Sequence, residues 1–447
     1  MRKFVTACTA LALVAGLSGC GVFKGGKKKT PVLGERVPIL MSENSISPDK
    51  SIAAIEVVLP PPAANESWNQ PGGNAAKSMG HLALADAPRQ IWRAQIPGGD
   101  TRVRLAAAPT VDGGKLFVMD TEGAVHAFDA NTGAKLWTVE TAAAGKDKKE
   151  AKKNARARFG GGASAEGGKV FATNGLGDVV ALDASNGAVL WRAKPGGPLR
   201  GAPTLANGNI YVLSQDNQLF ALNQADGSVV WTQAGSLESQ GVFGVAAPAA
   251  AQGTVVAGFS SGELNAYRYE NGSSVWADTL SRSSISTSVS SLSDIDAEPV
   301  IDQGRAYAVG QGGRMVALEL VTGQRLWEQN LAGISTPWVA GEWIFVVTDD
   351  ARLICLARAS GKIRWISQLR KYRKEKKQKD PIAWIGPVLA GGKLWLANSQ
   401  GQIVSASPTD GTVGYTLETK GRFGLPLMVA NSTLYSLNDK GGLTAYR

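Results

Sequence analysis

Histidine and cysteine, the side chains that most often bind metals, move protons or attack substrates, are rare in this chain of 447 residues. There are two histidines, His81 and His126, and three cysteines, Cys8, Cys20 and Cys355. The sequence contains no G-x-S-x-G, H-E-x-x-H, P-loop or C-x-x-C motif. We therefore expect no catalytic residue, no metal and no cofactor. His126 is expected to be packed within a strand or at a rim, and Cys355 in a core.

The N-terminus has the pattern of a secreted precursor. A basic MRK is followed by the apolar run FVTACTALALVAGL, which is too short to be a good membrane span. The run ends at LSGC, residues 17–20, which resembles the bacterial lipobox. This resemblance implies that a signal peptide, residues 1–19, is removed and that Cys20 is lipidated. By analogy with the enterobacterial sorting rule, Gly21 favours the outer membrane. An ordinary secretory signal cut nearby is the alternative.

Residues 20–66 are predicted to form a tether, because they are rich in proline, serine and charge and have little periodicity. Within them, IAAIEVVL (52–59) is either loosely ordered or a short helix or strand. The following stretch NQPGGNAAKSMGHLAL (69–84), which contains His81, is expected to lie against the folded domain.

A phrase that first reads DTEGAVHAFDANTGAKLW occurs seven times from residue 120 onward. Each copy ends in an aromatic residue, and these are Trp137, Trp191, Trp231, Trp276, Trp327, Trp365 and Tyr415. Four residues before each aromatic stands a glycine, namely Gly133, Gly187, Gly227, Gly272, Gly323, Gly361 and Gly411. Ten residues before it stands a small residue, namely Ala127, Ala181, Ala221, Ala266, Ala317, Cys355 and Ser405. The glycine suits a turn that requires a positive φ, and the small residue suits a crowded sheet face.

Each copy reads as strands joined by tight turns, such as TEG and NTG in the first copy. A further strand precedes each copy and resembles AAPTVDGGK (107–115). The terminal aromatics are 38 to 54 residues apart, which is the spacing of propeller blades. The sequence therefore predicts an all-β protein, a β-propeller of four-stranded antiparallel blades.

An eighth, partial copy, NDKGGLTAYR, reaches Arg447 without an aromatic of its own at the repeat position. Trp92 lies 45 residues before Trp137, which is one repeat unit. We therefore predict that the strand around Trp92 completes the last blade and closes a ring of eight blades over residues 67–447, leaving no open edge between blades. The terminal aromatics, Trp92 and Tyr415 included, are expected to wedge between sheets as structural residues.

The phrase A-x-D-A-x-T-G-x-x-x-W resembles the tryptophan-docking repeat of pyrroloquinoline-quinone (PQQ) propellers, over residues 68–447. Two groups carry this repeat: quinoprotein dehydrogenases and the BamB family of outer-membrane assembly factors. The dehydrogenases usually have an adjacent Cys-Cys pair and Ca²⁺ ligands, whereas this chain has no Cys-Cys and is shorter. A lipobox followed by eight such blades is similar to the BamB family, as is the segment LSDIDAEPV (292–300).

The resemblance implies a non-enzymatic lipoprotein on the periplasmic face of the cell outer membrane. It implies a subunit of the β-barrel assembly (BAM) complex that binds the POTRA domains of BamA and other BAM subunits and assists insertion of outer-membrane proteins. Contact with nascent β-barrel proteins and a monomeric propeller are further expectations, and nucleic acid is not an expected partner. The alternatives are a reduced quinoprotein dehydrogenase and a cell-envelope scaffold unrelated to barrel assembly.

The same resemblance implies a partner-binding site. The family's acidic contact pair falls on Asp294 and Asp296, and its second contact loop falls on Val242 and Phe243 in GVFGVAAP. That loop usually carries leucine and arginine, so Phe243 keeps an apolar contact and loses the guanidinium. If the approach to the strand is extended, both carboxylates point to one side and Ile295 to the other. The alternative role for the two aspartates is to cap a turn.

The formal net charge of +10 is concentrated in two segments. KDKKEAKKNARAR (146–158) and RKYRKEKKQKD (370–380) each hold seven basic and two acidic residues. Both lie in long connections between blades, as do residues 232–246 and 277–297, and we expect all of these on one face of the ring. The two basic segments are either solvated loops or surfaces that attract anionic lipid or an acidic patch on a partner.

Overall fold

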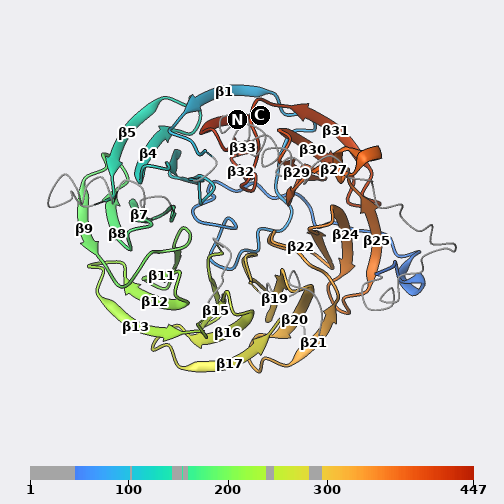
Figure 1. The fold of residues 1–447 in the computed structure, drawn as a ribbon, viewed down its shortest axis with the longest axis horizontal. Coiled ribbons are helices and arrows are strands. Elements are labelled where there is room, and N and C mark those ends of the chain that lie inside the picture. Colours follow the sequence, from blue (N-terminus) through green and yellow to red (C-terminus); the bar gives the residue numbers. More distant parts are fainter. Residues whose placement is uncertain (1–45, 101–102, 143–153, 155–159, 238–245, 281–293) are drawn as a thin grey trace, which may run out of the picture. The chain divides into compact units, whose positions relative to one another are not determined.

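In the computed structural model, residues 46–447 are described apart from 101–102, 143–153, 155–159, 238–245 and 281–293. The compact unit that runs from Ile46 to Arg447 is a closed ring of eight four-stranded antiparallel sheets (Figure 1). The predicted eight-bladed, all-β propeller is thereby confirmed. Within each blade, neighbouring strands in the sheet are also neighbours along the chain, with one exception at the point of closure.

The first four blades follow the chain in order. Blade 1 contains β2 (Thr110–Asp112), β3 (Lys115–Met119), β4 (Ala124–Asp129) and β5 (Lys135–Glu140). Blade 2 contains β6 (Ala163–Glu166), β7 (Lys169–Thr173), β8 (Val179–Asp183) and β9 (Val189–Ala193). Blade 3 contains β10 (Thr204–Ala206), β11 (Asn209–Leu213), β12 (Gln218–Asn223) and β13 (Val229–Ala234). Blade 4 contains β14 (Ala249–Ala251), β15 (Thr254–Gly258), β16 (Glu263–Arg268) and β17 (Ser274–Thr279).

The second half of the ring adds a small hairpin and the closing blade. Blade 5 contains β18 (Val300–Asp302), β19 (Arg305–Gly310), β20 (Arg314–Glu319) and β21 (Arg325–Gln329). Blade 6 contains β22 (Trp338–Ala340), β23 (Trp343–Val347), β24 (Arg352–Ala357) and β25 (Ile363–Gln368), and is followed by the hairpin β26 (Tyr372–Lys374) and β27 (Lys379–Pro381). Blade 7 contains β28 (Trp384–Ala390), β29 (Lys393–Asn398), β30 (Gln402–Ala406) and β31 (Val413–Glu418). Blade 8 contains β32 (Met428–Ala430), β33 (Thr433–Leu437), β34 (Gly442–Tyr446) and β1 (Gln90–Gln95).

Ring closure occurs as the sequence predicts. Strand β1, which lies far from β34 in the sequence, pairs antiparallel with it and places Trp92 opposite Ala445. The same cross-strand pair of a terminal tryptophan and a small residue recurs in six other blades, for example Ala127 opposite Trp137. A small side chain at this position leaves room for the indole on the same sheet face. This explains why the repeat places a small residue ten positions before its aromatic.

Neighbouring blades are joined by an indole of one blade that docks on a turn of the next. Each docked tryptophan donates its Nε1–H to a backbone carbonyl three residues before the repeat glycine. The donors and acceptors are Trp92 to Ala130, Trp137 to Ala184, Trp191 to Gln224, Trp231 to Tyr269, Trp276 to Leu320, Trp327 to Arg358 and Trp365 to Pro408, at 2.8–3.3 Å. The repeat glycine lies directly against the ring, and a Cβ on Gly361 would come within 2.5 Å of Trp327. The repeat therefore encodes the joint between blades.

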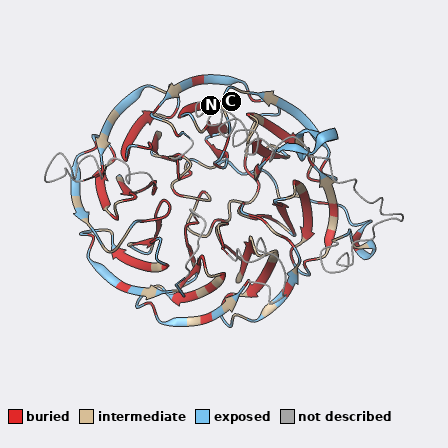
Figure 2. Cartoon of the chain, in the orientation of Figure 1, coloured by how far each residue is buried: buried red, intermediate tan, exposed pale blue. Residues whose placement is uncertain are grey.

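The burial pattern separates the strands of a blade into two kinds. Residues of the inner three strands are mostly buried, and those of the outermost strands are mostly exposed, as Figure 2 shows. In β12 the four central residues are all buried, whereas in β13 only Trp231 is. The outermost strand therefore buries its tryptophan against the next blade, while its free edge meets solvent.

The centre of the ring holds a segment that we name the inner belt, residues 65–82, part of the blue chain inside the ring in Figure 1. The first strand of every blade is a sheet edge, and the belt bonds with all eight blades in turn. Its contacts, in blade order 8, 1, 2, 3, 4, 5, 6 and 7, are Asn65 with Asn431, Trp68 with Val111, Asn69 with Ala165, Gln70 with Leu205, Ala75 with Ala250, Ala76 with Ile301, Gly80 with Trp338 and Leu82 with Leu389. The expectation that residues 69–84 lie against the propeller is confirmed.

Residues 46–66 also belong to the compact unit, which begins at Ile46 rather than at residue 67. The stretch 52–59 is neither a regular helix nor a strand, since only a 3₁₀ turn, η1 (Lys50–Ile52), forms beside it. Ile52 and Val57 are buried, and Asp49 N–H donates to the carbonyl of Ile363 in blade 6. Apolar burial explains why this part of the predicted tether is held on the ring. The signal peptide and residues 20–45 lie outside the described residues and stay predictions.

Candidate functional site

The long connections leave the ring on one face, which we name the connection face. Each runs from the outermost strand of one blade to the first strand of the next, and in an antiparallel meander all such connections emerge on the same side. The connections that follow β5, β13, β17 and β25 are the long ones that the sequence predicts. The opposite face carries the tight turns between first and second strands, where the inner belt also lies, since the Gly392 N–H donates to Nε2 of His81.

On the connection face, Asp294 and Asp296 converge on Arg200. The Arg200 Nη2 lies 3.2 Å from Oδ1 of Asp294 and 3.5 Å from Oδ1 of Asp296. Ile295, between them, is fully buried against Gly258 of blade 4. The chain here is extended enough that the two carboxylates share one side, as the alternation of side chains predicts. The cluster joins the approach to blade 3 with the approach to blade 5.

This ionic cluster is buried. The side chains of Arg200, Asp294 and Asp296 are 3%, 2% and 10% exposed. Burial and the neighbouring Asp294 carboxylate raise the pKa of Asp296 to about 7, although the Arg200 charge opposes the rise. One cation thus holds two carboxylates in an environment that penalises the second negative charge.

The structure thus places the two aspartates inside the connection face rather than on its surface. Arg200 is their intramolecular partner, which was not predicted. A direct contact between these carboxylates and a partner stays a prediction. Val242, Phe243 and all but one residue of the basic segment 146–158 lie outside the described residues.

A signal for Arg200 does exist in the repeat. Arg200 stands three residues before Pro203, at the approach to blade 3, and Asp296 stands three residues before Pro299, at the approach to blade 5. The two residues therefore hold the same repeat position with opposite charge. Equivalent positions of a ring lie on the same face and at the same distance from its centre. A comparison of this position across the blades therefore identifies Arg200 and Asp296 as a pair of opposite charge.

The second basic segment, 370–380, is an ordered hairpin on the connection face. It consists of β26, a 3₁₀ turn η2 (Glu375–Lys377) and β27. Asp380 accepts weak ion pairs from Arg373 and Lys374 at 3.7 and 3.4 Å, and Glu375 lies 3.8 Å from Arg370. These pairs are exposed, so they compensate little of the charge of the seven basic residues. The hairpin is a positively charged projection on a rigid base.

The two histidines and Cys355, whose side chains are the best suited to chemistry, make structural contacts. His126 Nε2 lies 2.6 Å from Asp120 Oδ2, and the other oxygen of Asp120 accepts the N–H groups of Glu122 and Ala124. Nδ1 of His81 donates to the carbonyl of Pro60 at 2.7 Å. Cys355 is a free, buried thiol whose pKa is raised by burial. These residues satisfy turns and fill the core, as the sequence analysis expects for His126 and Cys355.

Two features are absent from the described part of the chain. Among these residues, no group of three or more histidine, cysteine, aspartate or glutamate side chains is arranged to hold a metal ion. In the same part of the chain, no helix has the length and apolar character needed to cross a membrane.

Comparison with known proteins gives a consistent result. The family model described as outer membrane protein assembly factor BamB matches residues 78–148 and 121–367. The BamB of Yersinia pestis is 26% identical over 350 residues, which are 78% of this chain and 86% of that protein. The BamB of Escherichia coli K12 is 29% identical over 324 residues, covering 72% and 79% of the two chains.

Solved structures share the fold at low sequence identity. The crystal structure of BamB from Moraxella catarrhalis matches with a TM-score of 0.65 and 20% identity, over 81% of this chain and all of that one. A europium-containing methanol dehydrogenase matches almost as well in shape, with a TM-score of 0.64 and 15% identity, over 83% and 89% of the two chains. Shape alone therefore does not separate the two groups, whereas the family model does.

Proposed function

The chain belongs to the family of the outer membrane protein assembly factor BamB, and on that premise we propose that it is a non-enzymatic subunit of the β-barrel assembly (BAM) complex. The observation that carries the proposal is the family match over most of the ring. In this role the protein works by binding other proteins. Its two available surfaces are the connection face and the outer rim of sheet edges.

Anchoring follows from the N-terminal sequence. We propose that lipid attached to Cys20 holds the protein on the periplasmic face of the outer membrane. Only 25 residues, 21–45, lie between Cys20 and Ile46, where the compact unit begins. Fully extended, such a segment spans at most about 90 Å. The ring is then held within this distance of the membrane surface.

The contact with the POTRA domains of BamA is proposed on the connection face, at Asp294, Asp296, Val242 and Phe243. Since Arg200 already binds both carboxylates, we propose that the aspartates hold the approach to blade 5 in the shape that the partner meets. Arg200 is then a positioning residue for this contact. The basic hairpin 370–380, on the same connection face, adds long-range attraction to an acidic region of the partner.

The outer rim is the proposed contact for nascent β-barrel proteins. The outermost strands β9 and β13 have free edges and expose apolar side chains, with Val189, Leu190, Val229 and Val230 each 43–50% exposed. An unpaired strand can extend such an edge by backbone hydrogen bonds while its side chains cover these residues. This surface suits a client whose own strands are still unpaired.

Co-purification from detergent-solubilised envelope tests the proposed function. The tagged wild-type protein should retain BamA, and its absence would overturn the assignment to the BAM complex. The matched variant is Asp294→Asn with Asp296→Asn, because reversal to arginine would bury three cations together. We expect lower BamA yield with an unchanged circular dichroism spectrum. A folded double variant with wild-type yield would show that the aspartates take no part in the contact with BamA.

The second candidate is a quinoprotein dehydrogenase, which the shape of the methanol dehydrogenase favours. It predicts dye-linked oxidation of alcohols by the purified protein after addition of PQQ and Ca²⁺. A cell-envelope scaffold unrelated to barrel assembly is the third candidate, and the co-purification experiment separates it from the first.

A further inference from the structure

The junction between blades 7 and 8 is built differently from the other seven. Its terminal aromatic is Tyr415, which packs edge-on against Trp395 of its own blade at a centroid distance of 6.2 Å. The turn that would carry the repeat glycine is replaced by two separate segments, β34 ending at Tyr446 and β1 beginning at Gln90. Within the described residues, no indole docks on a glycine turn at this junction. The position that the indole occupies elsewhere is thus left open.

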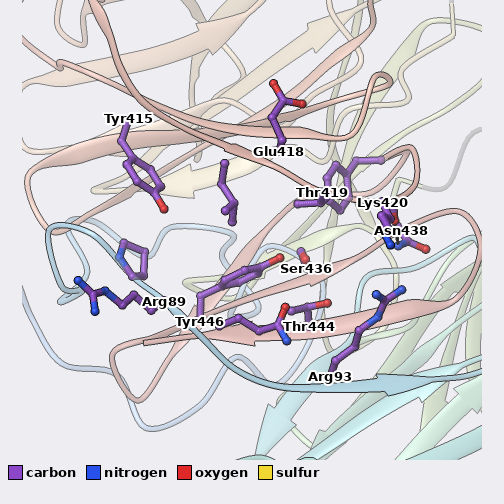
Figure 3. A pocket seen from close by; sticks show the side chains of 14 residues that line it. Arg89, Arg93, Tyr415, Glu418, Thr419, Lys420, Ser436, Asn438, Thr444 and Tyr446 are labelled. Carbon is purple, nitrogen blue, oxygen red and sulfur yellow. Dashed lines mark hydrogen bonds between the residues drawn. The ribbon is translucent and has the colours of Figure 1, made fainter.

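A cavity of about 410 Å³ lies at this junction, and we name it the seam pocket (Figure 3). Its apolar walls include the buried rings of Tyr446 and Phe423 and the Tyr415 ring, which is 36% exposed. The hydroxyl groups of Ser436 and Thr444 add hydrogen-bonding positions. A volume near the lower end of the range for small-ligand sites accommodates one or two side chains.

The polar groups at the pocket are mainly cationic. Arg89, Arg93 and Lys420 line it from exposed positions, with Arg89 and Arg93 at or next to β1, as Figure 3 shows. None of the three forms an ion pair with an acidic side chain among the described residues. The acidic lining residue, Glu418, accepts a hydrogen bond from Gln402 at 2.7 Å. With three cationic side chains and one carboxylate, the pocket presents a net positive charge beside aromatic surface.

The surroundings favour a peptide as the occupant. Strands β31 and β1 are the outermost strands of blades 7 and 8, so each presents a free backbone edge beside the pocket. Such an edge can bond the backbone of an extended segment while its side chains enter the pocket. Guanidinium groups bind carboxylates in a planar, two-point geometry that an ammonium group does not provide.

We propose that the seam pocket is a binding site for an extended peptide segment in which an acidic residue adjoins an aromatic residue. The aromatic side chain lies among Tyr415, Tyr446 and Phe423, and the carboxylate lies against Arg93 and Arg89. The site is independent of the connection face and of the identity of any BAM partner. It adds a pocket on blades 7 and 8 to the connection face and the outer rim as a contact surface of the protein.

The test uses three capped peptides with the full mature protein in detergent: acetyl-Gly-Phe-Asp-Gly-amide, its Asn analogue and its Ala-Asp analogue. Binding of the two Phe peptides is followed by ¹⁹F NMR of their 4-fluorophenylalanine versions. Binding of the Ala-Asp peptide, which has no phenylalanine, is measured by its competition with the labelled Phe-Asp peptide. We expect the Phe-Asp peptide to bind at least about 10-fold more tightly than either analogue, since each lacks one of the two contacts. No binding of the Phe-Asp peptide, or equal binding of the three, overturns the proposal.

The matched variants use the repeat itself. Arg93 directly follows Trp92 on β1, and Arg192 directly follows Trp191 on β9, at a junction where the indole is docked. Arg93→Gln and Tyr415→Ala should each weaken Phe-Asp binding about 10-fold, whereas Arg192→Gln should leave it unchanged. Equal losses in Arg93→Gln and Arg192→Gln would show non-specific attraction. Arg93-dependent binding of phosphatidylglycerol in mixed detergent micelles, without peptide binding, would assign the pocket to lipid and reject the proposal.

Discussion

The inter-blade joint predicts that two glycines of blade 5 respond very differently to one methyl group. Gly323 and Gly304 have nearly the same φ, +73° and +75°. A Cβ on Gly323 would lie 2.5 Å from Cγ of Trp276, whereas a Cβ on Gly304 would meet no atom within 4 Å. Substitution of each by alanine therefore separates the cost of the backbone from the cost of the joint.

The magnitudes follow from these two terms. An L-residue in the left-handed region costs about 1–2 kcal/mol, and both variants carry that cost. Gly323→Ala must also displace the docked indole, and overpacking of this kind costs about 1–3 kcal/mol. We therefore expect Gly304→Ala to lower the free energy of unfolding by about 1–2 kcal/mol, and Gly323→Ala by about 2–5 kcal/mol.

Equilibrium urea unfolding, followed by tryptophan fluorescence and circular dichroism, measures both values. In a Trp276→Leu background the extra cost of Gly323→Ala should disappear, since the leucine leaves room for the new methyl group. If Gly323→Ala and Gly304→Ala differ by less than about 0.5 kcal/mol, the indole does not depend on the glycine, and the account of the repeat fails.

Three further predictions concern charge and anchoring. The pKa of Asp296 is raised to about 7, above its unfolded value, so the ionised form is penalised in the native state. Asp296→Asn should therefore raise the free energy of unfolding by up to about 4 kcal/mol at pH 8 and hardly at all at pH 3.5. Equal effects at both pH values in urea titrations would contradict this. Replacing the lysines of 370–380 with glutamine should weaken BamA co-purification mainly at low salt, since exposed charges are screened over about 8 Å at physiological ionic strength; salt-independent loss would point to a direct contact. Cys20→Ala should give a folded protein that no longer incorporates radioactive palmitate, and undiminished labelling would remove the lipid anchor.

Of the candidate site, the sequence identified one half. The resemblance pointed to Asp294 and Asp296, and alternation placed both carboxylates on one side, which the structure shows. Their burial and their bond to Arg200 were not predicted. Arg200 is 94 residues from Asp294 in the chain, so no local pattern links them. Whether two such positions meet depends on how many blades the ring contains and on where each approach lies.

The fold itself was determined by the sequence, because the residues that form its joints recur at the same spacing in every copy of the repeat. A tryptophan, the glycine four residues before it and the small residue ten before it form one hairpin, and their spacing is the same wherever the hairpin occurs. The missing aromatic of the last copy pointed to Trp92, and β1 does pair with β34. Periodic, short-range requirements of this kind are visible in a single chain.

Only the tertiary structure decided the features that depend on closure of the ring. The inner belt bonds with eight first strands that become neighbours only when the ring is complete. Residues 46–66 join the compact unit through contacts with distant blades, such as Asp49 with Ile363 of blade 6 and Asn65 with Asn431 of blade 8. The seam pocket exists because two chain segments replace one hairpin where the ring closes. Such contacts occur once each, between residues far apart in sequence. Their energies come from burial and charge pairing, which are not part of the repeat pattern.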